Sequence, residues 1–397
     1  MTLNFGRPQL SIPGPSIIPD KVLQAMHRPS PDIYKGELVD IAHSLDTDLR
    51  RVARTSGYPV IYICNGHGTW EAALANTCSR GDRVLVLFTG RFGMGWAEVA
   101  EDMGIEVDSL SFGTKAIADP AVVTERLRDD KAHQIKAVLT VQTDTSTSVR
   151  NDIPALRAAI DAANHPALLM VDAMASLGCE RMEMDEWGVD VLLAGSQKGL
   201  MTPAGLGFLF FNDKADQARE TADLATRYWD WRPRARPDVF YQRFCGTAPT
   251  HHLFGLRAAL DILLNEEGIE AAWDRHARLA RATWAALGVW SSGGEVEMNV
   301  PDAEIRSHAV TTVLAPGGRA SQLRAWCEAE TGVTLGVGLS LDLEHSSGGD
   351  DVFRIGHMGH LNLPMLMGTL SAIEAGLSAL QIPHGKGALE AALTATT

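Results

Sequence analysis

The strongest constraint on the fold is a regular succession of short apolar runs separated by amphipathic segments. The runs have the length of strands, and most of the segments between them have the apolar spacing of helices. Such alternation predicts an α/β fold with a mainly parallel, seven-stranded sheet. The last two runs are joined by a short loop, which is compatible with an antiparallel pair. The seven runs are residues 60–64, 84–88, 105–109, 137–141, 167–171, 189–193 and 207–211.

The ends of the chain depart from this pattern. Residues 1–20 are rich in proline and glycine and are expected to form an extended arm on another surface. Residues 21–284 are then expected to form a large domain, and residues 285–397 a smaller α+β domain. Within them, a long helix is predicted from about His252 to Arg281. The smaller domain should contain a strand at 307–314, a helix at 321–331, short elements at 332–338 and 353–355, and a helix after Pro364.

Charge and cysteine usage narrow the range of partners. The formal net charge of −14 disfavours nucleic acid or an anionic membrane as a partner, so neither is expected. The five cysteines are scattered without a Cys-x-x-Cys pair, which fits free thiols in the cytoplasm better than disulfides or a metal site. The N-terminal residues lack the apolar core of a signal peptide, and no run approaches the length of a membrane span. A cytoplasmic protein without metal is the expectation.

A lysine and an aspartate stand at the ends of two predicted strands. Asp172 follows the run 167–171, and Lys198 lies in a small, flexible loop after the run 189–193. The carboxyl ends of parallel strands meet at one edge of a sheet, where ligands bind. Pyridoxal phosphate (PLP) requires an amine that can form an imine with its aldehyde and a carboxylate that pairs with its pyridine nitrogen. Taken singly, each residue is more often an ordinary surface lysine or loop aspartate, so the prediction depends on the residues around them.

A glycine-containing loop before a helix predicts a phosphate site. Asn65-Gly66-His67-Gly68-Thr69 follows a strand and opens the helix that begins near Trp70. Glycines allow close approach of the backbone, and a helix N-terminus offers free N–H groups and a positive dipole end. The alternative is an ordinary strand–helix turn with a threonine cap. The loop lacks the Gly-Lys-Ser/Thr of a nucleotide-binding loop and the spacing of a dinucleotide fingerprint, which makes a nucleotide-binding protein the weaker hypothesis.

Four further residues are suited to a flat anionic ligand. Phe92 could stack on a ring or simply belong to the core. Thr145 and Gln197 could hydrogen-bond a ring oxygen, although turn chemistry explains a Ser/Thr-rich stretch almost as well. Arg354 stands between apolar neighbours, where a guanidinium requires an anion. That anion is either a substrate carboxylate or an internal Asp or Glu.

Together these residues resemble the class V aminotransferases, and the resemblance covers nearly the whole chain. The closest likeness is to the branch of serine–, alanine– and aspartate–glyoxylate aminotransferases. Members are PLP-dependent and have the fold-type-I architecture of aspartate aminotransferase. The segments that carry the likeness begin at Pro13-Gly14-Pro15-Ser16 and the loop at Asn65. They continue through Val171-Asp172-Ala173-Met174-Ala175-Ser176-Leu177-Gly178, Gly195-Ser196-Gln197-Lys198-Gly199-Leu200, Thr247-Ala248-Pro249 and Arg354-Ile355-Gly356-His357-Met358-Gly359.

The resemblance implies a role for each matching residue around the ring. Lys198 matches the catalytic lysine, and Asp172 matches the partner of the pyridine nitrogen. Phe92 falls where the family stacks an aromatic residue, commonly tryptophan, so its stacking surface is smaller here. Gln197 and Thr145 match polar contacts to the ring hydroxyl.

The resemblance also implies phosphate and substrate contacts, some of them from a second subunit. Arg354 matches the anchor of the substrate carboxylate. Thr247 matches a phosphate contact supplied by the neighbouring subunit, which implies a homodimer with shared active sites. Phe244 replaces a tyrosine that often also binds phosphate in relatives. The family places Arg28 and Tyr34 on a gate near the entrance. The phosphate loop itself is matched by Gly66, His67, Gly68 and Thr69.

The expected reaction is transfer of an amino group from a small amino acid to glyoxylate, which leaves glycine and a 2-keto acid. The likeness favours aspartate as donor, with serine second. Aspartate needs an extra cation, for which the candidates are Arg28, Lys35, His251 and His252.

Several alternatives stay open. They are alanine as donor, a pyridoxamine–pyruvate aminotransferase, and a binding or regulatory protein of the same fold. A cysteine desulfurase is disfavoured, because Gln197 stands where that enzyme has a histidine and Cys327 falls in a predicted helix.

Overall fold

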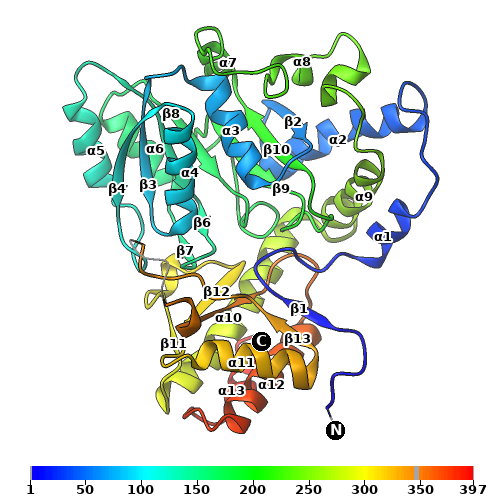
Figure 1. Cartoon of the computed structure of the whole chain (residues 1–397), viewed down its shortest axis with the longest axis vertical. Helices are drawn as coiled ribbons and strands as arrows, with labels where there is room; N and C mark the ends of the chain where they lie inside the picture. Colours follow the sequence, from blue (N-terminus) through cyan, green and yellow to red (C-terminus); the bar gives the residue numbers. More distant parts are fainter. Residues whose placement is uncertain (1, 344–347, 397) are drawn as a thin grey trace.

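The computed structural model describes residues 2–343 and 348–396. A seven-stranded sheet lies at the centre of the larger part of the molecule, and a smaller part packs beneath it (Figure 1). Every predicted run forms a strand of this sheet. In spatial order the strands are β2 (Tyr58–Tyr62), β10 (Gly207–Phe211), β9 (Val191–Gly195), β8 (Leu168–Asp172), β5 (Ile135–Val141), β3 (Arg83–Phe88) and β4 (Glu106–Ser111).

One strand of the sheet runs against the others. β10 is antiparallel to both of its neighbours, β2 and β9, whereas the remaining pairs are parallel. The sheet is therefore mainly parallel, and the short connection from β9 to β10 makes the antiparallel pair that the sequence allowed. This connection holds Lys198 at the carboxyl end of β9, beside the end of β8.

Helices cover both faces of the sheet, because successive strand residues point to opposite sides. Odd and even positions of the strands contribute to two separate apolar cores. The first core is closed by α2 (Glu37–Ala53), α5 (Pro120–Asp129), α6 (Ile153–Ala162) and α9 (Thr250–Asp261). The second is closed by α3 (Gly66–Thr77), α4 (Arg91–Asp102) and α7 (Asp213–Ala218).

The smaller part is an antiparallel sheet with helices, as the α+β pattern predicted. Its strands are β11 (Glu297–Met298), β12 (Val310–Leu314) and β14 (Val352–Gly356). The helices α11 (Arg319–Thr331), α12 (Leu363–Ala379) and α13 (Ala388–Thr394) share one apolar core with this sheet. The N-terminal arm lies against this part, where β1 (Gln9–Ser11) pairs in parallel with β13 (Val333–Leu335). None of the helices in the described ranges has the length and apolar character needed to cross a membrane.

The prediction of one continuous helix from about His252 to Arg281 is wrong, because this segment forms two α-helices joined by a π-helix. After α9 the backbone widens into a π-helix (Ile262–Glu267) and then breaks at Gly268, whose φ is +90°. Only glycine adopts that conformation without strain, so a new helix, α10 (Ile269–Ser292), starts there. α10 packs into the first core through Ala272 and into the C-terminal core from Leu279 onwards. The boundary expected after residue 284 falls inside this helix.

Candidate functional site

A cavity of about 230 Å³ lies at the carboxyl ends of the central strands. It joins the two residues on which the sequence argument depends, Lys198 and Asp172. Five other predicted residues also line it, namely Gly66, His67, Phe92, Thr145 and Gln197. The rest of its wall is formed by Asn65, Trp70, Val141, Thr143, Met174 and Ala175.

Asp172 is a buried carboxylate held by two N–H donors. The indole Nε1 of Trp70 donates to Oδ2 at 2.7 Å, and the backbone N of Met174 donates to Oδ1 at 2.6 Å. Burial nevertheless raises the pKa of Asp172 to about 6, and these two hydrogen bonds only partly oppose the shift. A cation inside the cavity would stabilise this carboxylate, which is the chemistry of a protonated pyridine nitrogen.

Lys198 is an almost fully buried amine whose surroundings favour its neutral form. Burial is the main cause that lowers its pKa to about 8, and the nearby charge of Arg354 acts in the same direction while Asp172 opposes it. The amine donates a hydrogen bond to the carbonyl of Pro13 in the N-terminal arm. The arm is tied to the same loop by Ser16, whose N donates to the carbonyl of Gln197 at 2.8 Å. A neutral amine near pH 8 is a nucleophile and a base.

The lowered pKa of Lys198 leads to a prediction for the cofactor-free protein. We expect the rate at which PLP attaches to Lys198 to rise with pH through a midpoint near 8, because only the neutral amine reacts. Stopped-flow absorbance over a pH series measures this rate. Arg354→Gln removes a charge that lowers the pKa of Lys198 and should move the midpoint upwards. A midpoint near 10.5, the ordinary value for lysine, would contradict the prediction.

The predicted phosphate loop is the first turn of α3. Asn65 caps the helix, and its side chain accepts a hydrogen bond from the N of Gly68 at 3.3 Å. The first amides of a helix have no partner within it, so those of Gly66 and His67 can bind an anion at the cavity wall. Thr69 is fully buried, and its hydroxyl donates to the carbonyl of Gly66 at 2.7 Å. Gly68 and Thr69 thus shape the turn without lining the cavity in this structure.

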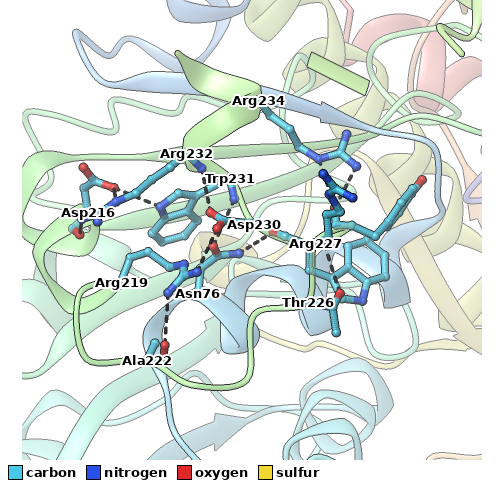
Figure 2. A network of polar contacts seen from close by, with 12 residues as sticks. Asn76, Asp216, Arg219, Ala222, Thr226, Arg227, Asp230, Trp231, Arg232 and Arg234 are labelled. Carbon is cyan, nitrogen blue, oxygen red and sulfur yellow. Dashed lines mark hydrogen bonds and ion pairs between the residues drawn. The ribbon is translucent and has the colours of Figure 1, made fainter. Parts of the chain in front are cut away.

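Residues 229–231, which include two tryptophans, pack against α3 and its first turn. A Cβ on Gly68 would lie 2.7 Å from the Cβ of Cys64 and 3.2 Å from the indole of Trp229, so the loop needs glycine there. Asn76 of α3 fixes the segment on both sides, because its amide donates to the carbonyl of Trp229 at 2.7 Å and accepts from the N of Trp231 at 3.1 Å. Asp230 accepts from Arg219 at 2.8 Å, and Figure 2 shows the side chains of this network closing around Asp230. These hydrogen bonds hold residues 229–231 against α3, whose first turn is the loop.

Phe92 is positioned by a second buried carboxylate. Asp144 accepts hydrogen bonds from the N of Phe92 at 2.9 Å and from the N of Gly93 at 3.3 Å. The N and hydroxyl of Ser146 donate to its other oxygen at 2.9 and 2.5 Å. A carboxylate at the first turn of α4 also complements the helix dipole. Asp144 therefore fixes the start of the helix from which Phe92 faces the cavity.

Arg354 is buried next to the cavity but does not line it. Its Nε donates to the carbonyl of Val337 at 2.8 Å, and one terminal nitrogen donates to the carbonyl of Thr145 at 3.0 Å. Thr145 itself lines the cavity, so Arg354 lies directly behind this part of the wall. The sequence allowed two partners for Arg354, a substrate carboxylate or an internal Asp or Glu. Among the described residues, no Asp or Glu forms an ion pair with Arg354.

The remaining predicted residues lie away from the cavity in the single chain. Arg28 pairs with Glu37 at 2.5 Å and lies over the ring of Phe254, 3.9 Å from its centre. Tyr34 is 73% exposed, and Thr247 is exposed as well. Neither belongs to the cavity wall.

Phe244 and Cys327 are excluded from the site by burial. Phe244 packs edge-on against Phe240 in the core, consistent with its lack of a polar group. Cys327 lies in α11, as the sequence predicted. Its side chain is fully buried, and burial raises the pKa of its thiol to about 12. A thiol in that state is a poor nucleophile, which argues against desulfurase chemistry.

Sequence reasoning missed three contacts of the site. Trp70 was expected only as a helix residue, although a buried indole N–H requires an acceptor and could have suggested Asp172. Asp144 directly precedes the Ser/Thr-rich stretch noted in the sequence, but its role in holding Phe92 was not foreseen. The carbonyl of Pro13 had no sequence signal as a partner of Lys198.

The donor set of the cavity fits PLP. Gln197 supports this fit independently, because its Oε1 is buried without a hydrogen-bond partner among the described residues. A side-chain amide in this position can turn its NH₂ group to a ring oxygen. PLP requires an amine, a buried carboxylate and amides that bind its phosphate. Lys198, Asp172 and the first turn of α3 provide these groups in turn.

Comparisons with known proteins agree with this chemistry. The family model described as aminotransferase class-V matches residues 13–350. The serine–glyoxylate aminotransferase of Methylorubrum extorquens is 38% identical over 96% of this chain and 94% of its own length. The L-aspartate–glyoxylate aminotransferase of Paracoccus denitrificans is 34% identical over 94% of this chain and 91% of its own. The crystal structure of pyridoxamine–pyruvate aminotransferase from Mesorhizobium loti matches with a TM-score of 0.88 and 26% identity, covering 100% of this chain and 99% of that one.

Proposed function

The chain belongs to the class-V aminotransferase family and is a PLP-dependent aminotransferase, and from this premise we propose that it transfers the amino group of L-aspartate or L-serine to glyoxylate. The products would be glycine and the 2-keto acid of the donor. The observation that carries the proposal is the pairing of Lys198 and Asp172 across one cavity, with an amine of lowered pKa and a buried carboxylate.

In such a transfer, each of the main residues of the cavity would have a separate role. Bound PLP supplies an aldehyde that accepts the amino group and a ring that takes up the electron pair left at the substrate α-carbon. The amine of Lys198 would take the proton from the substrate α-carbon and donate it to the carbon on the other side of the transferred nitrogen. Asp172 would keep a proton on the ring nitrogen. Gly66 and His67 would bind the phosphate through their amides, and Phe92 would cover the ring.

Arg354 is proposed to bind the α-carboxylate of both substrates. The guanidinium is buried directly behind Thr145, and its remaining terminal nitrogen can donate to a carboxylate. A local cation is needed because the chain as a whole carries a net charge of −14 and repels anionic substrates. The two curated relatives with the names given above support glyoxylate as acceptor, and aspartate and serine as the donors to be tested first.

A homodimer is part of the proposal. Thr247 and the loop residues Asn65 and His67 are exposed in the single chain, although two of them line the cavity. A second copy that covered this face would place its Thr247 at the phosphate end of the cavity and close it to water. Sedimentation equilibrium of the PLP-loaded protein measures the mass directly, and a monomer would contradict this part of the proposal.

A panel of amino donors tests the proposed function. We expect glyoxylate, supplied with L-aspartate or L-serine, to yield glycine at rates well above those with L-alanine. Oxaloacetate and pyruvate serve as the competing acceptors. Turnover with alanine but with neither aspartate nor serine would overturn the choice of donor. Activity with free pyridoxamine and pyruvate instead would support the alternative suggested by the likeness to the Mesorhizobium loti enzyme.

A further inference from the structure

Trp70 connects the two parts of the cavity wall that would hold opposite ends of PLP. It lies in α3 one helical turn after Gly66, and only 2% of it is exposed. Its indole Nε1 donates to Oδ2 of Asp172 at 2.7 Å. The first turn of α3 would bind the phosphate, and Asp172 would bind the ring nitrogen. Trp70 therefore belongs to the element at one end of the cofactor and contacts the carboxylate at the other end.

The indole of Trp70 is held in place by two aromatic rings and by α4. The ring of His67, in the first turn of α3, lies 4.6 Å from it between centres. The ring of Trp96 stacks on it at 6.1 Å, with 14° between the two planes. A Cβ on Gly95 of α4 would lie 3.4 Å from its outer edge. Packing thus fixes the direction in which the N–H of Trp70 points.

Trp96 is a second buried tryptophan in the same contact, but its N–H has a different environment. Its side chain is fully buried in the apolar core that also contains Trp70. Its Nε1 has no hydrogen-bond partner within the described ranges, whereas that of Trp70 donates to a carboxylate. The two residues therefore allow the effect of the N–H to be separated from the effect of the packed ring.

The hydrogen bond from Trp70 favours the charged form of Asp172. Burial is the main cause that raises the pKa of Asp172, and the charge of Asp144 adds to it. The backbone N of Met174, the indole of Trp70 and the charge of Lys198 act in the opposite direction. Only the ionised carboxylate can pair with a protonated ring nitrogen. Loss of the indole N–H would therefore leave Asp172 neutral over a wider range of pH.

We propose that Trp70 is a positioning residue whose indole N–H holds the Asp172 carboxylate at a fixed place relative to the first turn of α3. PLP is short and stiff, so it binds well only where its ring nitrogen and its phosphate find their partners at the matching separation. Of the two donors to Asp172, Met174 belongs to the segment that directly follows it, whereas Trp70 belongs to α3. The inference rests on the proposed function only where it concerns the rate of transfer.

Trp70→Phe keeps an aromatic ring and removes the N–H. In the PLP-loaded enzyme we expect kcat with aspartate and glyoxylate to fall about tenfold, the effect of one hydrogen bond to a charged group, while both KM values stay within about twofold. Affinity for PLP, measured by titrating the cofactor-free protein, should also fall about tenfold. Trp96→Phe is the matched control and should change each quantity by less than about twofold.

Urea unfolding of the cofactor-free protein over a pH series gives a readout that a purely structural role would not move. Removal of the donor should raise the pKa of Asp172 above its value of about 6 in the wild type. The wild type and Trp70→Phe should respond alike below about pH 6. Between about pH 6 and 8 the variant should lose a further tenfold in its folding equilibrium constant. In an Asp172→Asn background, where no carboxylate titrates, Trp70→Phe should cause no such loss.

The outcomes separate this inference from the proposed function. The same pH response in Trp70→Phe as in the wild type, or an equal extra loss in Trp96→Phe, would overturn the role of Trp70. A pH-dependent loss that persisted in the Asp172→Asn background would also overturn it, because the ring would then act through packing. Failure of the wild type to form glycine from glyoxylate with any donor would overturn the proposed function, and the unfolding measurements would still decide the role of Trp70.

Discussion

Lys198→Ala is expected to abolish amino-group transfer with every donor, lowering kcat by at least about 10³-fold. The variant loses both the amine that holds the cofactor and the base that moves the α-proton. No other lysine lines the cavity, so nothing in its wall can replace this amine. Stopped-flow and steady-state assays with aspartate and glyoxylate measure the effect, and the absorption spectrum reports whether PLP is attached to the protein.

Two comparisons show whether this loss is chemical. Lys115 is exposed on a loop, so Lys115→Ala should keep full activity and the full visible absorption band. Added methylamine should restore part of the rate of Lys198→Ala, because a small amine can enter the space that the side chain leaves and take over the proton transfer. Retention of more than about a tenth of the wild-type kcat would exclude Lys198 as the acid–base group.

The sheet and the main pair of site residues could be predicted because both depend on local patterns. Each strand is a short apolar run, and β-strand ends at the same edge of a parallel sheet are neighbours whatever their distance in sequence. Asp172 and Lys198 are therefore brought together by topology alone. The helix start at which the phosphate site was predicted followed in the same way, since a strand that leads into a helix presents the free amides of its first turn.

The contacts that position these residues could not be predicted, because they join distant parts of the chain. Trp70 and Asp172 are 102 residues apart, and Pro13 and Lys198 are 185 apart. Each depends on a side-chain direction or an arm position that no local pattern encodes. The break at Gly268 was missed for a different reason. A single glycine within a helical pattern can be tolerated or can end the helix, and here Gly268 follows a π-helix and takes a positive φ.

The candidates for a second cation could not be placed for the same reason. Arg28, Lys35, His251 and His252 were expected near the substrate because their segments are near the cofactor in relatives. In the structure, none of the four lines the cavity that holds Lys198 and Asp172.

Asp172→Asn is expected to lower kcat about 10²- to 10³-fold, the loss that follows when one partner of a buried charge pair becomes neutral. An amide has the same shape as the carboxylate, so the cavity should keep its form, although the amide can accept from only one of the two N–H donors of Trp70 and Met174 and the other hydrogen bond is lost. The amide cannot hold a proton on the ring nitrogen, however, and the ring then takes up electrons less readily. Steady-state kinetics with aspartate and glyoxylate measure the loss, and a fall of less than about fivefold would contradict the role of Asp172.

The same variant should change how the cofactor-free protein responds to pH. Burial raises the pKa of Asp172 to about 6 from its ordinary value of 3.8, so the folded state binds this proton more tightly than the unfolded state. Below pH 4 both states are protonated and the group has no effect. Between pH 4 and 6 the unfolded state ionises first, and the free energy of unfolding falls by about 3 kcal/mol in total. Asn cannot titrate, so this fall should be missing from the variant.

Urea unfolding of the cofactor-free wild type and of Asp172→Asn between pH 4 and 7.5 measures the difference. The wild type should lose stability relative to the variant as the pH rises, with most of the change complete by about pH 7. Asp129→Asn is the control, because Asp129 is exposed in the last turn of α5. The difference in the free energy of unfolding between the wild type and this variant should not change with pH. A flat difference for Asp172→Asn as well would mean that its carboxylate is not penalised by burial. The argument that this carboxylate requires a cation in the cavity would then fail, even if kcat still fell.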